Sequence, residues 1–239
     1  MSNNKSIVFD VVGTLVSYDR LFVAIDSRLG DRLRAQGIQP KLLGCCWLET
    51  AEREYTYLSL NGRYVVFFEI FEALFFRVLM YAGISQPRTF AMPEDVQYII
   101  GEWRKLDLRP GAAECISKLR EAGFTVYCFT TAELSRVQGY FDRGGVEMPA
   151  EHLISCDTAG LAKPIPEAYK QIWGKFSSSS VKPWFAAAHM WDVSAATKVG
   201  FRGAYATVLE GEALPEIFGE LEIMAETLPE MAEKIIEAS

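Results

Sequence analysis

The chain has 239 residues, of which 50% are apolar and 13% aromatic, so it can bury one substantial core and a smaller accessory domain. Its net charge of -7 comes without a basic stripe, which argues against nucleic acid or an anionic membrane as a partner. The five cysteines show neither metal-ligand spacing nor a disulfide framework. No apolar stretch reaches membrane-spanning length and no signal peptide precedes the first apolar run, so we expect a cytoplasmic protein.

The first informative segment reads Ile-Val-Phe-Asp-Val-Val-Gly-Thr-Leu-Val and covers residues 7–16. An apolar run of strand length stops at one carboxylate, Asp10, and Gly13 and Thr14 then let the backbone turn sharply. Asp10 is therefore expected at the carboxyl end of a buried strand, where open α/β sheets place reactive groups. Taken alone, an Asp before Gly-Thr is more often a residue that caps the following turn.

Two patterns divide the chain. Residues 17–105 are almost entirely helix-compatible, with breaks near 37–40, 61–62 and 83–93. From Arg109 onward, helical and strand patterns alternate, which is typical of a parallel sheet. We therefore predict an α/β core of residues 1–16 and 106–239, with a helical insertion at 17–105.

The insertion contains an aromatic helix at residues 67–79, which is apolar around more than one face. Burial on several sides explains most of this composition. One face of the helix could also cover an active site or form a dimer contact.

Two later segments place polar residues at element ends. A helical stretch at 112–122 stops at Gly123, and an alternating strand pattern then ends at Thr130 and Thr131. A loop at 160–165 contains Lys163 before a proline, and Pro166 suits the first turn of a helix that carries Tyr169. When each segment is considered alone, a threonine at a strand end is more often structural than catalytic, and a lysine in such a loop is more often an exposed surface residue.

A last segment, residues 184–200, is an apolar strand that continues into a helix. Asp192 lies early in this helix, where an ordinary first-turn acid is also favoured by the helix dipole. His189 precedes the helix, and a buried, hydrogen-bonded histidine explains it about as well as a functional one. The serine run at 177–180 before this strand is short enough to be a loop.

These four segments together resemble the haloacid dehalogenase superfamily, and the pattern of Ala188, His189 and Asp192 resembles its 2-haloacid dehalogenase branch. The resemblance implies a Rossmann-like core with a parallel sheet and an inserted helical cap domain. It also implies that Asp10 attacks the substrate to form a covalent ester, a recognised use of carboxylate nucleophiles. The catalytic residues expected from the resemblance are Asp10, Thr14, Thr130, Lys163, Tyr169 and Asp192, and those expected around the substrate are Val12, Glu49, Arg53, Thr131, His189 and Trp191.

Val12 is a departure that bears on the reaction. Phosphatases of this superfamily have a second Asp at this position, which protonates the leaving oxygen. A halide leaves without a proton, so Val12 favours the dehalogenase branch. Only Asp10 and Asp192 then remain as carboxylates for a hard cation, so we expect no cofactor and no Mg²⁺.

Glu49 is a departure that bears on the substrate. The 2-haloacid dehalogenases have a cap arginine, shortly before a Glu-Tyr-Thr triplet, that binds the substrate carboxylate and receives the halide. Here the triplet is residues 54–56, and the matching position is Glu49, which would repel a carboxylate. Arg20, Arg53 and Arg63 are the candidates to replace the missing arginine.

The sequence therefore predicts a hydrolase that displaces a leaving group, halide, from a saturated carbon of a small molecule. Related dehalogenases are commonly homodimers, and the resemblance suggests the same here. Two alternatives stay open: an enzyme of specialised metabolism that acts on a larger apolar substrate by a different reaction, and a binding protein with a degenerate site. Retention of Asp10, Lys163 and Asp192 argues against degeneracy, because isolated buried charges are costly.

Overall fold

The computed structural model describes residues 5–176 and 181–239 and shows two compact units. The core unit comprises the chain up to Ser17 together with Asp107–Ser239, and the helical unit comprises Tyr18–Leu106. The helical unit is thus inserted into the core sequence just after the first strand. The serine run at 177–180, expected as a loop, lies outside the described residues, as do residues 1–4.

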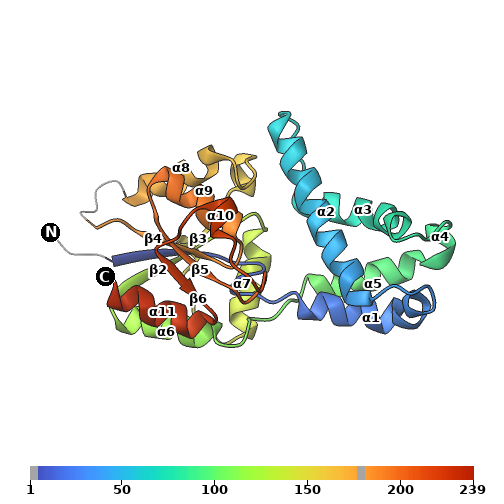
Figure 1. Ribbon diagram of the computed structural model, residues 1–239, viewed down its shortest axis with the longest axis horizontal. Coiled ribbons are helices and arrows are strands. Elements are labelled where there is room, and N and C mark those ends of the chain that lie inside the picture. The colour runs from blue at the N-terminus through green and yellow to red at the C-terminus, as the bar shows by residue number, and fades with distance from the viewer. Residues whose placement is uncertain (1–4, 177–180) are drawn as a thin grey trace. The chain divides into compact units, whose positions relative to one another are not determined.

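The core unit is built on a parallel sheet of six strands in the order β3-β2-β1-β4-β5-β6 (Figure 1). This is the Rossmann order, in which the chain leaves the central strand toward one edge and later returns to its other side. The fold prediction is thereby confirmed. The strands are β1 (Lys5–Asp10), β2 (Phe124–Thr130), β3 (Leu153–Ser155), β4 (Trp184–Ala187), β5 (Arg202–Ala206) and β6 (Ile223–Ala225).

Helices cover both faces of this sheet, which is why its central strands are continuous apolar runs. In Figure 1, α6 and α11 lie on one face, while α8 and α9 lie on the other. Between α8, α9 and the sheet, Phe129, Tyr169, Phe185 and Phe201 belong to one buried cluster. The helices of the core unit are α6 (Ala112–Glu121), α7 (Leu134–Arg143), α8 (Pro166–Trp173), α9 (Met190–Val199), α10 (Pro215–Phe218) and α11 (Leu228–Glu237), with short 3-10 helices at Ala150–His152, Asp157–Ala159 and Gly174–Phe176.

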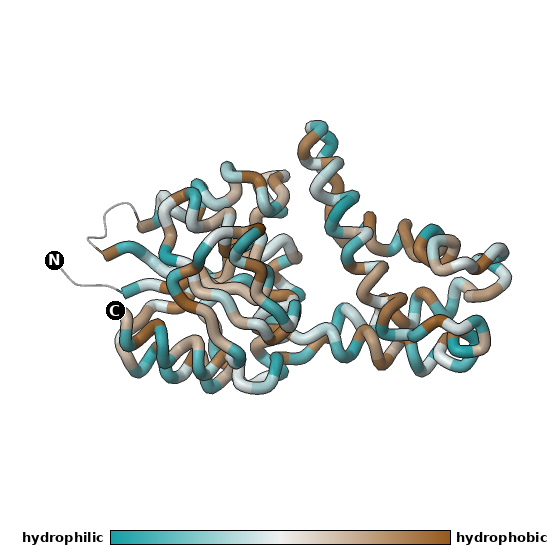
Figure 2. Tube along the Cα trace, in the orientation of Figure 1, coloured by the Kyte–Doolittle hydropathy of each residue, from teal (hydrophilic) through white to brown (hydrophobic). Residues whose placement is uncertain are grey.

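The helical unit contains five helices in the described residues, and its loops lie near the predicted breaks, although the short helix α4 lies within the break predicted at 83–93. Apolar and polar residues alternate along these helices, as the tube in Figure 2 shows. Aromatic rings fill the interior: Trp47 stacks on Phe71 with ring centroids 3.8 Å apart, and Trp103 lies 3.9 Å from the same ring. Core packing therefore accounts for much of the aromatic stretch. The helices are α1 (Asp19–Arg34), α2 (Pro40–Leu60), α3 (Phe67–Tyr81), α4 (Pro87–Phe90) and α5 (Pro93–Trp103).

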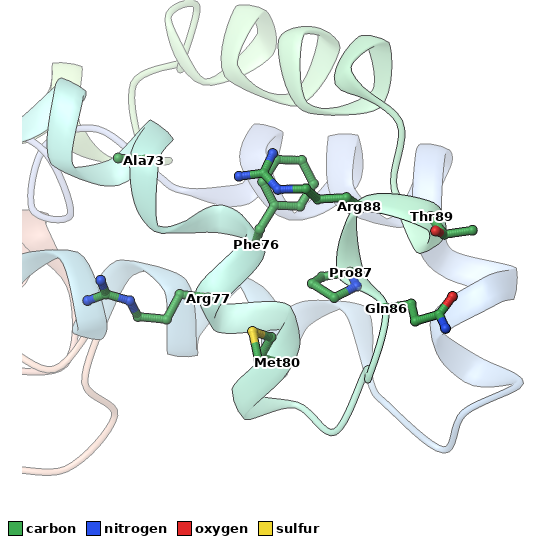
Figure 3. Close-up of a pocket in the computed structure, with 8 residues that line it drawn as sticks. All are labelled: Ala73, Phe76, Arg77, Met80, Gln86, Pro87, Arg88 and Thr89. Carbon is green, nitrogen blue, oxygen red and sulfur yellow. The ribbon is translucent and has the colours of Figure 1, made fainter.

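A surface hollow of ≈ 460 Å³ lies between α3 and α4 of the helical unit (Figure 3). The guanidinium of Arg88 lies 4.3 Å from the ring centroid of Phe76, on the rim of this hollow. Among the described residues, no helix is long and apolar enough to cross a membrane.

The five cysteines are free thiols. Burial raises the pKa of the Cys115 and Cys156 thiols to about 12, and it also raises that of Cys128. Such thiols are poor nucleophiles at neutral pH, which agrees with a packing role.

Candidate active site

The predicted catalytic side chains come from the carboxyl edge of the sheet. Asp10 is the last residue of β1, and it lies beside Phe129, the penultimate residue of the neighbouring β2. On the other side of β1, β4 leads through Ala188 to His189, which is the N-cap of α9. Neighbouring parallel strands end at the same edge, so residues distant in sequence converge there.

Lys163 joins two carboxylates at this edge. Its Nζ atom donates to Asp10 Oδ1 at 2.9 Å, to Asp192 Oδ2 at 2.8 Å and to the Phe129 carbonyl at 3.0 Å. These three bonds use the full donor capacity of an ammonium group. With the lysine only 3% exposed, the arrangement is a buried cation between two buried anions.

The second oxygen of Asp10 receives the hydroxyl of Thr14. Thr14 Oγ1 donates to Asp10 Oδ2 at 2.7 Å and accepts a hydrogen bond from the Ala188 amide at 2.9 Å. Because the amide supplies one of these two protons, the single hydroxyl proton of Thr14 is directed to Asp10. Both carboxylate oxygens of Asp10 therefore have a fixed donor.

His189 lies beside the same oxygen, with Nδ1 3.6 Å from Asp10 Oδ2. Its ring occupies the space that a side chain at Gly13 would need, since a Cβ there would lie 2.6 Å from His189 Cε1. Gly13 also has a φ of 95°, which L side chains rarely adopt. Glycine at this position thus permits both the turn and the placement of the histidine.

The electrostatics of the site keep Asp10 ionised. Burial by itself would raise the pKa of Asp10, but Lys163, His189 and Thr14 hold it well below its ordinary value. Burial would lower the pKa of Lys163, but Asp10 and Asp192 raise it above its ordinary value, so this lysine keeps its proton. Burial and the neighbouring Asp10 raise the pKa of Asp192, although Lys163 opposes this shift.

Tyr169 supports the second carboxylate. Its hydroxyl donates to Asp192 Oδ1, so each oxygen of Asp192 has a donor. Burial, and then the negative charge of Asp192, raise the pKa of Tyr169 well above its ordinary value. The tyrosine therefore remains a neutral donor at neutral pH.

The structure brings six of the predicted residues into one cluster of direct contacts: Asp10, Thr14, Lys163, Asp192, Tyr169 and His189. The other predicted residues of the core unit lie at the ends of nearby elements. Thr130 ends β2, and its hydroxyl accepts a hydrogen bond from the Ala132 amide at 3.1 Å. The ring of Trp191 lies 5.3 Å from that of His189. Val12 lies in the turn after β1, and Thr131 directly follows β2.

Two predicted substrate contacts lie in the helical unit, on α2. Glu49 is exposed, and Arg53 donates to Glu54 at 3.2 Å. Their roles stay predictions.

Sequence reasoning missed two backbone groups of the site and the side chain of Arg109. The Phe129 carbonyl and the Ala188 amide complete the contacts of Lys163 and Thr14, and Arg109 binds the turn after β1. An arginine before a proline gives no signal of this in the sequence, because its partners are carbonyls about 95 residues away.

Two buried carboxylates and one lysine make up the charged centre of the site. Within the part of the chain that the structure describes, no three His, Cys, Asp or Glu side chains cluster in a way that could hold a metal ion. One oxygen of Asp10 and one of Asp192 are instead bridged by the ammonium of Lys163. Because Mg²⁺ keeps several waters and needs only one or two carboxylates, the expectation that the enzyme works without it stays a prediction.

A model of the haloacid dehalogenase-like hydrolase family matches residues 5–200. The chain belongs to this family. The match covers the inserted helices and the core unit from β1 through α9, so it confirms the family predicted from the four sequence segments. It also confirms that this haloacid dehalogenase-like hydrolase is an enzyme.

The chain is also similar to individual curated dehalogenases. The hydrolase is 24% identical over 205 residues to (S)-2-haloacid dehalogenase 2 of Pseudomonas sp. (strain CBS-3), a match that covers 84% of this chain and 83% of the relative. It is 25% identical over 203 residues to haloacetate dehalogenase H-2 of Moraxella sp. (strain B), covering 84% and 85% of the two chains.

Among solved structures, the L-2-haloacid dehalogenase of Xanthobacter autotrophicus with covalently bound chloropropionic acid has a TM-score of 0.74 to this chain. That match has 18% identity and covers 99% of this chain and 100% of the other. At this identity the likeness establishes a shared fold.

Proposed function

We propose that this hydrolase displaces a leaving group, halide, from a saturated carbon of a small molecule, through an ester formed on Asp10. The observation that carries the proposal is the environment of Asp10: a buried carboxylate at a strand end, kept ionised by Lys163 and Thr14. Such a carboxylate is a fixed nucleophile that needs no deprotonation step. The names of the curated relatives, which are dehalogenases of haloacids, support this reading.

In the first step, an oxygen of Asp10 attacks the carbon that bears the halogen. The new carbon–oxygen bond forms as the carbon–halogen bond breaks, and the halide leaves with the bonding electron pair. No proton is transferred, which agrees with Val12 at the position where a general acid would otherwise lie. A relative that holds chloropropionic acid covalently supports an intermediate of this kind.

In the second step, water attacks the carbonyl carbon of the Asp10 ester. Asp192 and His189 orient this water, one of the two accepts its proton, and that proton is then returned to the departing alkoxide of the product. Lys163 and Thr14, together with Thr130, stabilise the negative charge on the carboxylate oxygens. Tyr169 keeps Asp192 and thereby Lys163 in place.

Around the reacting atoms, we assign substrate contacts to Val12, Thr131, His189 and Trp191 of the core unit, and to Glu49 and Arg53 of the helical unit, which acts as the cap. We also propose that the enzyme is a homodimer. These assignments follow the family resemblance.

The decisive experiment follows the oxygen of water into Asp10. A single turnover in ¹⁸O-water, with enzyme in excess over 2-bromopropionate or its ethyl ester, should place the label in the Asp10 peptide, as measured by mass spectrometry. The Asp10→Asn variant should fold and yet release no bromide. Label in the hydroxylated product with an unlabelled Asp10 would instead show direct attack by water.

A further inference from the structure

Arg109 makes an unusual set of contacts beside the candidate active site. Its guanidinium donates from Nη2 to the Gly13 carbonyl at 2.7 Å, from Nε to the Thr14 carbonyl at 3.0 Å and from Nη1 to the Val208 carbonyl at 2.9 Å. The backbone amide of Arg109 donates to the Leu15 carbonyl at 2.8 Å. One residue thus binds three successive carbonyls of the turn that follows Asp10.

This turn determines where the hydroxyl of Thr14 lies. The turn is closed by hydrogen bonds from the Gly13 amide to the Val16 carbonyl and from the Val16 amide to the Val11 carbonyl, both at 2.9 Å. Thr14 bonds Asp10 at 2.7 Å and Ala188 at 2.9 Å, so a shift of its backbone would change both distances. Arg109 holds the same backbone from another direction, through the carbonyls of Gly13 and Thr14.

The hydrogen bond from Arg109 to the Val208 carbonyl extends this network toward Asp192. Val208 belongs to the loop after β5, and Glu210 of the same loop accepts a hydrogen bond from the Met190 amide at 3.0 Å. Met190 is the first residue of α9, the helix that carries Asp192. Arg109 therefore links the turn after Asp10 to the loop that caps the helix of Asp192, entirely within the core unit.

We propose that Arg109 is a positioning residue for the nucleophile, acting through the Gly13–Thr14 turn on Asp10. The proposal rests on the proposed nucleophilic role of Asp10. A planar guanidinium with its fork of donors suits three carbonyls at fixed positions, whereas a lysine ammonium at the end of a flexible stem does not. The interaction is with backbone groups, so it sets geometry and does not contact the substrate.

The kinetic test compares Arg109→Lys, Thr14→Ala and the double variant, using bromide release from ethyl 2-bromopropionate. Arg109→Lys should lower kcat roughly 10- to 100-fold with little change in KM, because small displacements of reacting groups cost that much. The double variant should be no slower than Thr14→Ala alone, since both changes act on one hydrogen bond. Additive losses, or a loss confined to KM, would overturn the proposal.

Arg202 provides a matched control in the same unit. It also makes several hydrogen bonds, to Glu222 at 3.0 Å and to the Ala238 carbonyl at 3.1 Å, at the amino end of β5. Arg202→Lys should affect urea unfolding about as much as Arg109→Lys does, and should leave kcat unchanged. An equal loss of kcat in both variants would assign Arg109 a structural role only.

A second measurement needs no substrate. The groups that face the Asp10 carboxylate are Lys163, Thr14 and His189. Loosening the Thr14 donor should raise the pKa of Asp10, seen by carboxyl-carbon NMR in Arg109→Lys and not in Arg202→Lys. An unchanged Asp10 titration in Arg109→Lys would overturn the positioning role, whereas an active Asp10→Asn would overturn the proposed function instead.

Discussion

Lys163 is the residue on which the charge balance of the site depends. Two carboxylates would repel each other in a site that excludes water, and the ammonium between them makes their burial tolerable. The same contact holds the pKa of Asp10 low despite burial, which keeps this carboxylate, the proposed nucleophile, ionised at physiological pH. Both the burial of the two carboxylates and the ionised state of Asp10 thus depend on one cation.

Replacing Lys163 with Met should destabilise the core unit by about 3–5 kcal/mol near pH 7.5, because two buried carboxylates lose their partner. The loss should shrink near about pH 5. Without the lysine, burial raises both carboxyl pKa values, so these groups gain protons in the folded state as the pH falls and the variant recovers stability. In the wild type, by contrast, the contribution of Asp10, whose pKa is depressed, is lost as the pH falls through its folded value.

Urea unfolding at both pH values measures this difference. Lys118→Met is the control, because Lys118 pairs with Glu114 and Glu233 on the surface. Its replacement should change the free energy of unfolding little at either pH. An equal destabilisation of Lys163→Met at both pH values would show that lost packing, and not charge, is responsible.

At the scale of elements, the backbone of the turn after β1 places Thr14 and leaves room for His189 beside Asp10, the proposed nucleophile. Gly13→Ala should cost roughly 1–2 kcal/mol for the left-handed backbone and should also lower kcat roughly 10- to 100-fold, because the new Cβ displaces His189 or the turn. Gly123, between α6 and β2, also has a positive φ, of 85°, but a Cβ there meets nothing within 4 Å. Gly123→Ala should therefore lose similar stability and keep full activity. Full activity in Gly13→Ala would remove the steric argument for His189.

The elements that the sequence predicted well are those with strong periodicity and clear boundaries. Gly123 separates α6 from β2 as expected, and the carboxylate that stops the first apolar run ends β1. Convergence of Asp10, Lys163 and Asp192 follows once a parallel sheet is inferred, because strand ends share an edge. The contacts of Arg109 could not be predicted, because carbonyl acceptors are the same in every residue and carry no sequence signal.

At the scale of the whole molecule, the acidic composition decides how metal dependence must be tested. With 31 acidic and 24 basic residues, the surface will bind Mg²⁺ weakly whatever the reaction requires, so binding alone is uninformative. Turnover should survive exhaustive EDTA treatment, because Lys163 already bridges the two carboxylates. Activity that is lost and then restored by Mg²⁺ alone would move the enzyme to the phosphatase branch.

The substrate preference is predicted from Glu49 of the helical unit. With Glu49 at the position expected for a carboxylate-binding arginine, we predict weak turnover of chloroacetate and 2-chloropropionate and a preference for bulkier, less anionic compounds. Charge-assisted hydrogen bonds contribute roughly 1.5–3 kcal/mol each. Replacing a bidentate arginine with a like-charged glutamate should therefore weaken the binding of a 2-haloacid carboxylate by more than about a hundredfold.

Halide release across paired acids, ethyl esters and amides measures this preference directly. Glu49→Arg should raise kcat/KM for 2-chloropropionate at least about tenfold, since it restores an attractive contact. Glu72→Arg, at another exposed glutamate of the helical unit, makes the same change in net charge and should not. The comparison therefore separates a local contact from the general effect of a less negative protein on an anionic substrate. Efficient turnover of small 2-haloacids by the wild type would show that the alignment of Glu49 is wrong, or that Arg20, Arg53 or Arg63 has taken over the role.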